Sequence, residues 1–251
     1  MGRTIAILNQ KGGVGKTTVT LGLTSAAVTS GHRVLVVDLD PQGSSSWVLG
    51  VDPRAVEESV AEVLSRTPAS RVIQASDWGE GVFVLPSSPR LIGRDHGGNP
   101  ERLRTALAEL VDDYDAVLID CPPSLGALTA AGLTAADHAL IVVEPSELAL
   151  RGITAVADLV DEVWDEYNPD LDLAGVIVNK VPAVSSEAER RYDELTRTVG
   201  KKAVWQPVIP QRVIVNQALG ERCPIHAYGA RASDVIAAFD ALWGKVRRLG
   251  H

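Results

Sequence analysis

Residues 9–18 read NQKGGVGKTT, and this stretch decides the fold. It follows an apolar segment, residues 3–9, that predicts a β-strand, and it precedes a helix-like segment over residues 17–30. A glycine-rich loop between a strand and a helix aims backbone N–H groups and a helix N-terminus at one point, which suits a di- or triphosphate. We therefore predict a phosphate site in this loop.

Two side chains of the loop complete the predicted site. Lys16 supplies a cation to the terminal phosphates, and the hydroxyl of Thr17 can ligate magnesium. A flexible glycine turn is the alternative, but six specified residues between strand and helix argue against it. The predicted phosphate-contacting residues are Gly12, Gly13, Val14, Gly15, Lys16, Thr17 and Thr18.

Strand and helix patterns alternate along the rest of the chain. The continuous apolar run at 33–38 (RVLVVD) is typical of a strand buried on both faces. Asp-Pro and Asn-Pro pairs predict helices over 52–65 and 99–113, and the last helix is predicted over 231–249. Further strands are predicted at 81–85, 115–120, 138–143 and 173–179, with helices starting near 125, 147 and 186. We predict an α/β fold over 1–251, a single domain with one doubly wound, mostly parallel sheet and helices on both faces.

Three acids stand at predicted strand ends. Asp120 closes an apolar strand beside the loop and is predicted to hold magnesium through a water. Asp40 follows the second strand, where it can orient an attacking water, and Asp38 is predicted as a supporting or metal-binding carboxylate. An ordinary strand-end cap is the alternative for each of them.

Composition and charge exclude several classes of protein. The chain of 251 residues has 45% hydrophobic residues, a formal charge of -8 and no apolar run of the length that spans a bilayer. Residues 186–251 carry eleven Lys and Arg against seven acids, which leaves +4 there and -12 elsewhere. This split favours a local basic face on an acidic body, with solvated helix faces as the alternative. Cys121 and Cys223 form no paired motif, which fits a reducing cytosol.

The form of the loop points to one superfamily. Lys11 adds a second lysine to it, and lysine-Gly-Gly-x-Gly-Lys-Thr is the deviant Walker A sequence of the ParA and MinD superfamily. The resemblance extends to VDLDPQG at 37–43, VLIDCPPS at 117–124, LRG at 150–152 and VIP at 208–210. The chain resembles a ParA-type partition ATPase, in the short form without an N-terminal DNA-reading extension.

The resemblance implies roles that the residues alone leave open. Lys11 would cross a dimer interface to the other subunit's nucleotide, and Gly12 would press against the partner loop. The implied cofactors are ATP and Mg²⁺, with Asn179 on the adenine edge and Pro210 over the ring. From the residues alone, we would interpret Lys11 as a solvated lysine of the loop and Asn179 as a residue that favours a turn.

The implied partners follow from the same family. An ATP-bound homodimer would bind nonspecific DNA through phosphate contacts, and a ParB-like centromere-binding protein would stimulate hydrolysis. The protein would be cytoplasmic and nucleoid-associated. The family pattern R-N-V-R is replaced by QRVI at 211–214, so one expected cation is missing. The candidate DNA-binding residues are Arg190, Arg191, Lys201, Lys202, Arg212 and Arg222, with Arg247 and Arg248 ranked below them.

A MinD-like membrane role is the alternative function. Residues 235–249 (VIAAFDALWGKVRRL) are amphipathic, as in an interfacial helix. Their apolar spacing is more typical of a helix packed on a core, so we expect no membrane partner.

Overall fold

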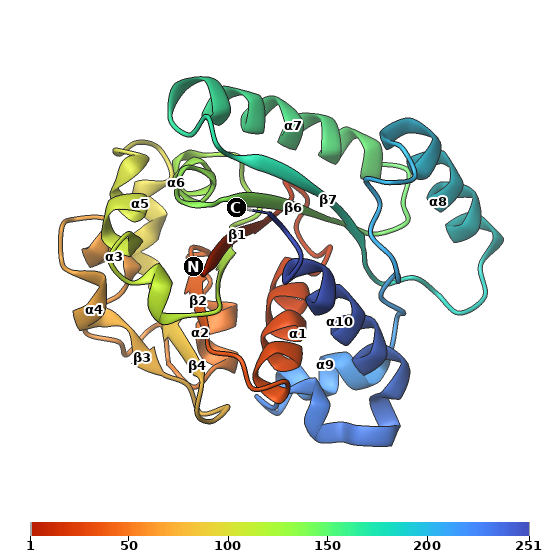
Figure 1. The fold of residues 1–251 in the computed structure, drawn as a ribbon, viewed down its shortest axis with the longest axis horizontal. Helices are drawn as coiled ribbons and strands as arrows, with labels where there is room; N and C mark the ends of the chain where they lie inside the picture. The colour runs from red at the N-terminus through yellow and green to blue at the C-terminus, as the bar shows by residue number, and fades with distance from the viewer. Residues whose placement is uncertain (1, 251) are drawn as a thin grey trace.

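The computed structural model describes residues 2–250 and shows a seven-stranded sheet between two layers of helices (Figure 1). The strands are β1 Arg3–Leu8, β2 Val34–Asp38, β3 Gln74–Ala75, β4 Val82–Leu85, β5 Ala116–Asp120, β6 His138–Val143 and β7 Asp172–Val178. The helices are α1 Lys16–Thr29, α2 Ser44–Val48, α3 Val60–Val63, α4 Ala69–Val72, α5 Glu101–Leu107, α6 Ala127–Ala135, α7 Ala149–Glu166, α8 Ser186–Val199, α9 Val213–Gly220 and α10 Ser233–Val246. The 3-10 turns are Pro89–Arg94, Val111–Asp113 and Ile225–Ala232.

The sheet has the order β3-β4-β2-β5-β1-β6-β7, and all its pairs are parallel except β3 with β4. Side chains alternate between the faces of a strand, so Ala6 and Leu8 join one core while Ile5 and Ile7 join the other. Both faces are covered, which explains why the strands read as continuous apolar runs. The predicted fold class is confirmed.

Different sets of helices cover the two faces of the sheet. Helices α5, α6 and α7 cover one face, and α1, α9 and α10 cover the other (Figure 1). A methyl group at Gly22 of α1 would lie 2.2 Å from the ring of Phe239 in α10, so these helices pack closely. The apolar face of the amphipathic C-terminal segment is therefore buried in the core, as its spacing predicted.

One predicted helix is wrong. Instead of a helix over 52–65, the chain makes turns after Asp52 and forms only α3. The Asp52 side chain accepts a hydrogen bond from the backbone of Arg54, a local bond that competes with helix formation. Ser59 and Glu62 then form a capping box that starts α3 seven residues later than predicted. The short α2 and α9 were not predicted.

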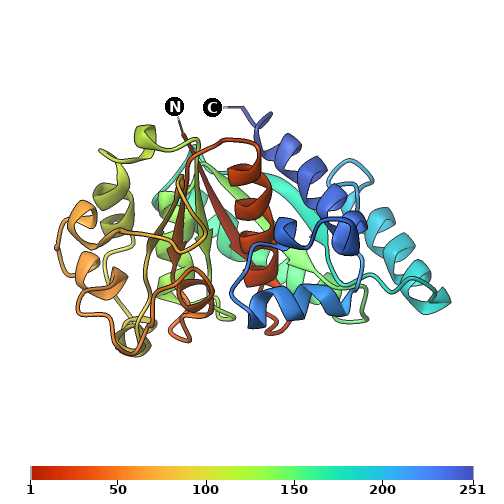
Figure 2. The ribbon, with the colours of Figure 1, turned by 90° about the horizontal axis from the view of Figure 1, so that it is seen from below.

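The phosphate loop and the chain termini lie at opposite ends of the sheet. The loop follows the carboxyl end of β1, and Figure 2 shows both termini at the opposite end of the molecule. Because β2, β5, β6 and β7 lie parallel to β1, the residues that follow them gather at the loop's end of the sheet.

Candidate nucleotide site

The phosphate loop has the backbone of an anion cradle. Gly13 and Gly15 have φ angles of 81° and 95°, in the left-handed region, and Gly15 is the N-cap of α1. A Cβ at Gly15 would lie 2.1 Å from the side-chain nitrogen of Asn179, so both conformation and space require glycine there. The N-terminus of α1 therefore opens directly onto the loop.

The two residues that follow β7 donate side-chain hydrogen bonds to backbone carbonyls of the phosphate loop. The Asn179 amide donates to the carbonyl of Val14 at 2.9 Å, and the Lys180 ammonium donates to the carbonyl of Gly13. Lys180 has a φ of 55°, a conformation that costs free energy for a residue with a side chain. The sequence did not predict this clamp.

A hollow of about 110 Å³ lies beside the first turn of α1. It brings together Asn179 and Pro210, the two residues predicted at the base, although they are distant in sequence. Contact of either residue with a base stays a prediction. The lining residues are Thr18, Asn179, Lys180, Pro210, Gln211, Arg212, Val215 and Asn216.

Asn179→Ala separates the two roles of this side chain. Loss of the bond to Val14 leaves a loop carbonyl without its partner, so we expect nucleotide affinity to fall by about 10-fold. If Asn179 acts only through the loop, fluorescence titration will show the same loss for ATP and GTP. A loss confined to ATP would show instead that the side chain reads the base.

Asp38 and Asp120 lie side by side, paired in register between β2 and β5. One oxygen of Asp120 accepts hydrogen bonds from Thr17 at 2.7 Å and from Ser45 at 2.5 Å. Its other oxygen is buried and has no partner among residues 2–250. A buried orphan oxygen beside the Thr17 hydroxyl is a hard donor set, which fits Mg²⁺ and its water ligands.

Asp38 is also buried, but its oxygens are engaged. One oxygen accepts from the backbone and the hydroxyl of Ser46, at 2.8 and 2.7 Å, and the other accepts from the backbone of Asp40 at 3.1 Å. Burial and the neighbouring Asp120 raise the pKa of Asp38 to about 8, and burial raises the pKa of Asp120 to about 6. Asp38 thus supports the segment that carries Asp40.

Asp38→Asn should stabilise the protein at alkaline pH. A carboxyl whose folded-state pKa is raised favours folding below its unfolded pKa, and that contribution is lost as the pH rises through about 8. The amide carries no charge, but its nitrogen cannot accept the hydrogen bond that Asp40 or Ser46 donates to a carboxylate oxygen. We therefore expect a gain of only about 1–2 kcal/mol in the free energy of unfolding at pH 8.5, less than removal of the charge alone would give. Urea unfolding should show the gain shrinking toward pH 4. An equal effect at both pH values would contradict the charge argument.

The two lysines of the loop lie differently. Lys16 is 7% exposed, and burial lowers its pKa while Asp120 opposes that shift. The ammonium of Lys11 forms an ion pair with Glu144, the residue after β6, and its backbone N–H donates to Asn9 at 2.9 Å. Lys11 is therefore held by its own chain and does not extend freely into solvent.

Asp40 lies on a partly exposed turn after β2. Its side chain accepts a hydrogen bond from the backbone of Gln42 at 2.9 Å, and its carbonyl accepts one from the hydroxyl of Ser87. The backbone N–H of Asp40 donates to the buried Asp38, and Asp40 itself is partly exposed. Its predicted role toward a water stays a prediction.

Sequence reasoning missed four polar residues that support the site. Three features of the sequence could have revealed them: the serines directly after the VDLDPQG segment, an acid directly after the strand at 138–143, and the asparagine at the start of the loop. Hydrogen bonds or ion pairs tie each of them to a predicted residue. The four are Asn9, Ser45, Ser46 and Glu144.

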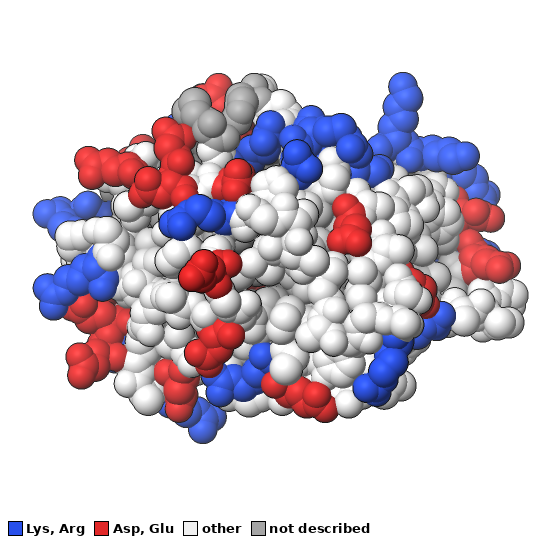
Figure 3. Space-filling model, turned by 60° about the horizontal axis from the view of Figure 1, so that its bottom comes forward, with Lys and Arg blue, Asp and Glu red and all other residues white. Residues whose placement is uncertain are grey.

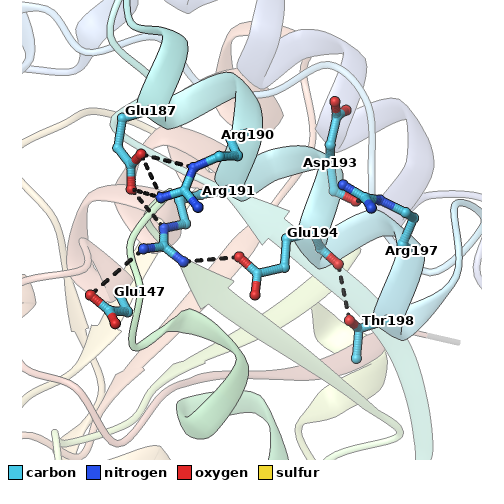
Figure 4. A network of polar contacts seen from close by, with 8 residues as sticks. All are labelled: Glu147, Glu187, Arg190, Arg191, Asp193, Glu194, Arg197 and Thr198. Carbon is cyan, nitrogen blue, oxygen red and sulfur yellow. Dashed lines mark hydrogen bonds and ion pairs between the residues drawn. The ribbon is translucent and has the colours of Figure 1, made fainter.

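The predicted DNA-binding arginines are mostly paired with acids (Figure 4). Arg190 forms a two-pronged pair with Glu187, and Arg191, with a side chain 14% exposed, contacts Glu147, Glu187 and Glu194. Two more pairs are Arg212 with Asp234 at 2.6 Å and Arg222 with Asp77 at 3.7 Å. Lys201 and Lys202 are exposed and form no ion pair within residues 2–250.

The loop, the adjoining helix N-terminus and the paired strand-end acids define a P-loop nucleotide-binding protein. A family model described as an AAA domain matches residues 2–173. The chain is 35% identical to the sporulation initiation inhibitor protein Soj of Bacillus subtilis, over 92% of this chain and 93% of Soj. It is 34% identical to the chromosome partitioning protein ParA of Myxococcus xanthus, over 92% and 83% of the two chains.

The comparison with solved structures agrees with this class. A crystal structure described as cobyrinic acid a,c-diamide synthase from Mycobacterium smegmatis, with an ATP analogue and magnesium bound, superposes with a TM-score of 0.84. It is 32% identical and covers 99% of this chain and 95% of its own. The chain therefore belongs to the Soj and ParA family of ATPases.

Proposed function

We propose that this protein is a partition ATPase that binds Mg-ATP in the loop between β1 and α1. The observation that carries the proposal is the hydrogen bond of Thr17 to Asp120, whose second oxygen is buried without a partner, at the mouth of the loop. Residues 12–18 would hold the phosphates, and Thr17 and Asp120 would hold the metal, Asp120 through a water. The bound magnesium would neutralise phosphate charge.

Each of the remaining residues has a separate task. Lys16 neutralises charge on the terminal phosphate from a buried position, where an ion pair is weakly screened. Asp40 orients water from its turn, and Asp38 holds that turn by accepting its backbone N–H. Asp40 lies on a partly exposed turn, and we expect slow intrinsic turnover because no strong general base accompanies it within residues 2–250.

Hydrolysis would require two chains. Lys11 would leave Glu144 and reach the nucleotide of a second subunit, where its charge stabilises the transferring phosphoryl group. Gly12 is exposed at the tip of the loop, as a residue that meets a partner loop has to be. The pair with Glu144 would hold Lys11 until the partner arrives.

The ATP-bound dimer would bind DNA without sequence preference, and a ParB-like protein would release it by stimulating hydrolysis. A membrane role has less support, because the apolar residues of α10 pack on α1 and are unavailable for lipid. In addition, no helix within residues 2–250 has the length and apolar character to cross a bilayer.

Size-exclusion chromatography with ATP, with and without DNA, tests this function. We expect a monomer with ADP, a dimer with ATP, and co-elution of the ATP form with DNA. Dimerisation followed by flotation with anionic vesicles would identify a membrane ATPase. A monomer that converts a small molecule would remove the partition role altogether.

A further inference from the structure

Lys180 has an uncommon backbone conformation for a lysine. Its φ of 55° lies in the left-handed region, which costs free energy for a residue with a Cβ and which glycine adopts readily. The turn at Lys180 follows β7 and leads Val181 into pairing with Pro210, where the Val181 N–H donates to the carbonyl of Ile209 at 3.0 Å. Glycine would make this turn at lower cost, so the turn alone does not explain a lysine here.

The side chain of Lys180 contacts the phosphate loop. Its ammonium donates to the carbonyl of Gly13, and the adjacent Asn179 amide donates to the carbonyl of Val14 at 2.9 Å. Lysines and arginines are common on the molecular surface, and Figure 3 shows groups of them on one face. Surface charge therefore does not distinguish Lys180, whereas its bond to a loop carbonyl does.

These two bonds fix the direction of two backbone N–H groups. In a trans peptide, the carbonyl of one residue and the N–H of the next point in opposite directions. The peptide bonds of the loop are trans, so a Gly13 carbonyl held toward Lys180 turns the N–H of Val14 away from it. Asn179 does the same for the N–H of Gly15 by holding the carbonyl of Val14. Neither N–H has a hydrogen-bond partner within residues 2–250, so both can donate to an anion on the opposite side of the loop.

We propose that Lys180 is a positioning residue for phosphate binding, which holds the carbonyl of Gly13 so that the N–H of Val14 faces the nucleotide. The inference rests on the proposed function and adds to its site a residue that lies far from the loop in sequence. A hydrogen bond from an ammonium is stronger than one between neutral groups, so it holds the peptide plane firmly. The left-handed conformation of Lys180 is retained because it aims the ammonium at the loop.

Charge variants test whether the ammonium is needed. Lys180→Met keeps an unbranched side chain without the charge, and we expect it to bind ATP about 10-fold more weakly. Lys180→Arg keeps the charge and should recover most of the affinity. Lys245→Met removes a partly exposed lysine on α10 and should bind ATP as the wild type does. Isothermal titration calorimetry with Mg²⁺ measures all four proteins. Wild-type affinity in Lys180→Met would overturn the inference alone, whereas a wild-type protein that binds no ATP would refute the proposed function.

Inorganic tripolyphosphate separates positioning of the loop from contact with the nucleoside. It has no base and no ribose, so a misdirected Val14 N–H should weaken its binding by the same factor as that of ATP. Displacement of a fluorescent ATP analogue from the wild type and from Lys180→Met gives the two factors. A loss confined to ATP would show that Lys180 contacts the base or the ribose, which would overturn the positioning role.

Amide NMR follows the two N–H groups directly. In the wild type, the amide protons of Val14 and Gly15 should both move downfield when Mg-ATP saturates the site, because each donates to a phosphate. In Lys180→Met the change at Val14 should shrink, while the change at Gly15 remains because Asn179 still holds its peptide. Unaltered changes at both residues in the variant would overturn the inference.

Lys180→Gly distinguishes this role from that of a turn residue. Lys180→Gly and Lys180→Met both lose the ammonium, but glycine also relieves the left-handed backbone. We expect the glycine variant to unfold about 2–4 °C above the methionine variant and to share its loss of ATP affinity. If ATP affinity instead follows the thermal midpoint, Lys180 serves the turn alone and the positioning role is wrong.

Discussion

Lys16→Ala is expected to weaken ATP binding at least about 100-fold. The ammonium is 7% exposed at the first turn of α1, and Asp120 and Asp40 lie close enough to influence its pKa. Its removal leaves phosphate charge facing these carboxylates in a buried site, where the loss of a charged partner costs about 2–5 kcal/mol. Isothermal titration calorimetry with ATP and Mg²⁺ measures the loss directly.

A folding control accompanies this variant, because Lys16 is itself buried. Lys16→Gln keeps a polar side chain of intermediate length and removes the charge. We expect it to lose affinity as the alanine variant does while keeping a wild-type thermal unfolding midpoint. Lys201→Ala removes an exposed lysine elsewhere and should bind ATP normally. Wild-type affinity in both Lys16 variants would remove the phosphate assignment of the loop.

Asp40→Ala is expected to separate binding from hydrolysis. The carboxylate stands on a turn beside the loop, and within residues 2–250 its side-chain hydrogen bond is to the backbone of Gln42 alone, so its loss should leave the nucleotide cradle intact. A residue that orients the attacking water contributes about 10²–10⁴-fold to turnover. We therefore expect kcat to fall by that factor while ATP affinity and ATP-dependent dimerisation remain.

Phosphate release measures turnover, and size-exclusion chromatography measures ATP-dependent dimerisation. Asp40→Asn keeps the turn and should show the same loss of turnover, because an amide is a poorer acceptor for a water proton. Turnover at the wild-type rate in both variants would assign the water to another group. Loss of ATP binding as well would show that Asp40 supports the loop.

The central strands and the loop were predictable because their signals are local. A continuous apolar run such as HALIVV predicts a strand buried on both faces, and the structure places β6 on these residues. Gly13 and Gly15 adopt positive φ angles within one turn, a conformation that favours glycine. The sequence of the loop is therefore enough to predict its backbone turn. The helix predicted at 52–65 failed because one aspartate bond to the backbone outcompeted a weak local preference.

The charged residues were the least predictable part. Arg191 and Arg248 look alike in the sequence, yet one is enclosed by three glutamates and the other is exposed without an acidic partner in residues 2–250. A charge count does not reveal this difference, since an ion pair depends on where the acids of other elements lie. Likewise, Glu144 is distant in sequence from Lys11 and reaches it only because β6 lies beside β1.

The sequence alone determined the class of the protein, the parallel sheet and the glycine-rich turn between β1 and α1, because each depends on neighbours in the chain. Tertiary structure decided the partners of the acids and cations: Asp38 beside Asp120, Asn179 against the loop, and Lys11 beside Glu144. The physical reason is that burial and charge compensation are properties of a place in three dimensions, set by strand order and helix packing.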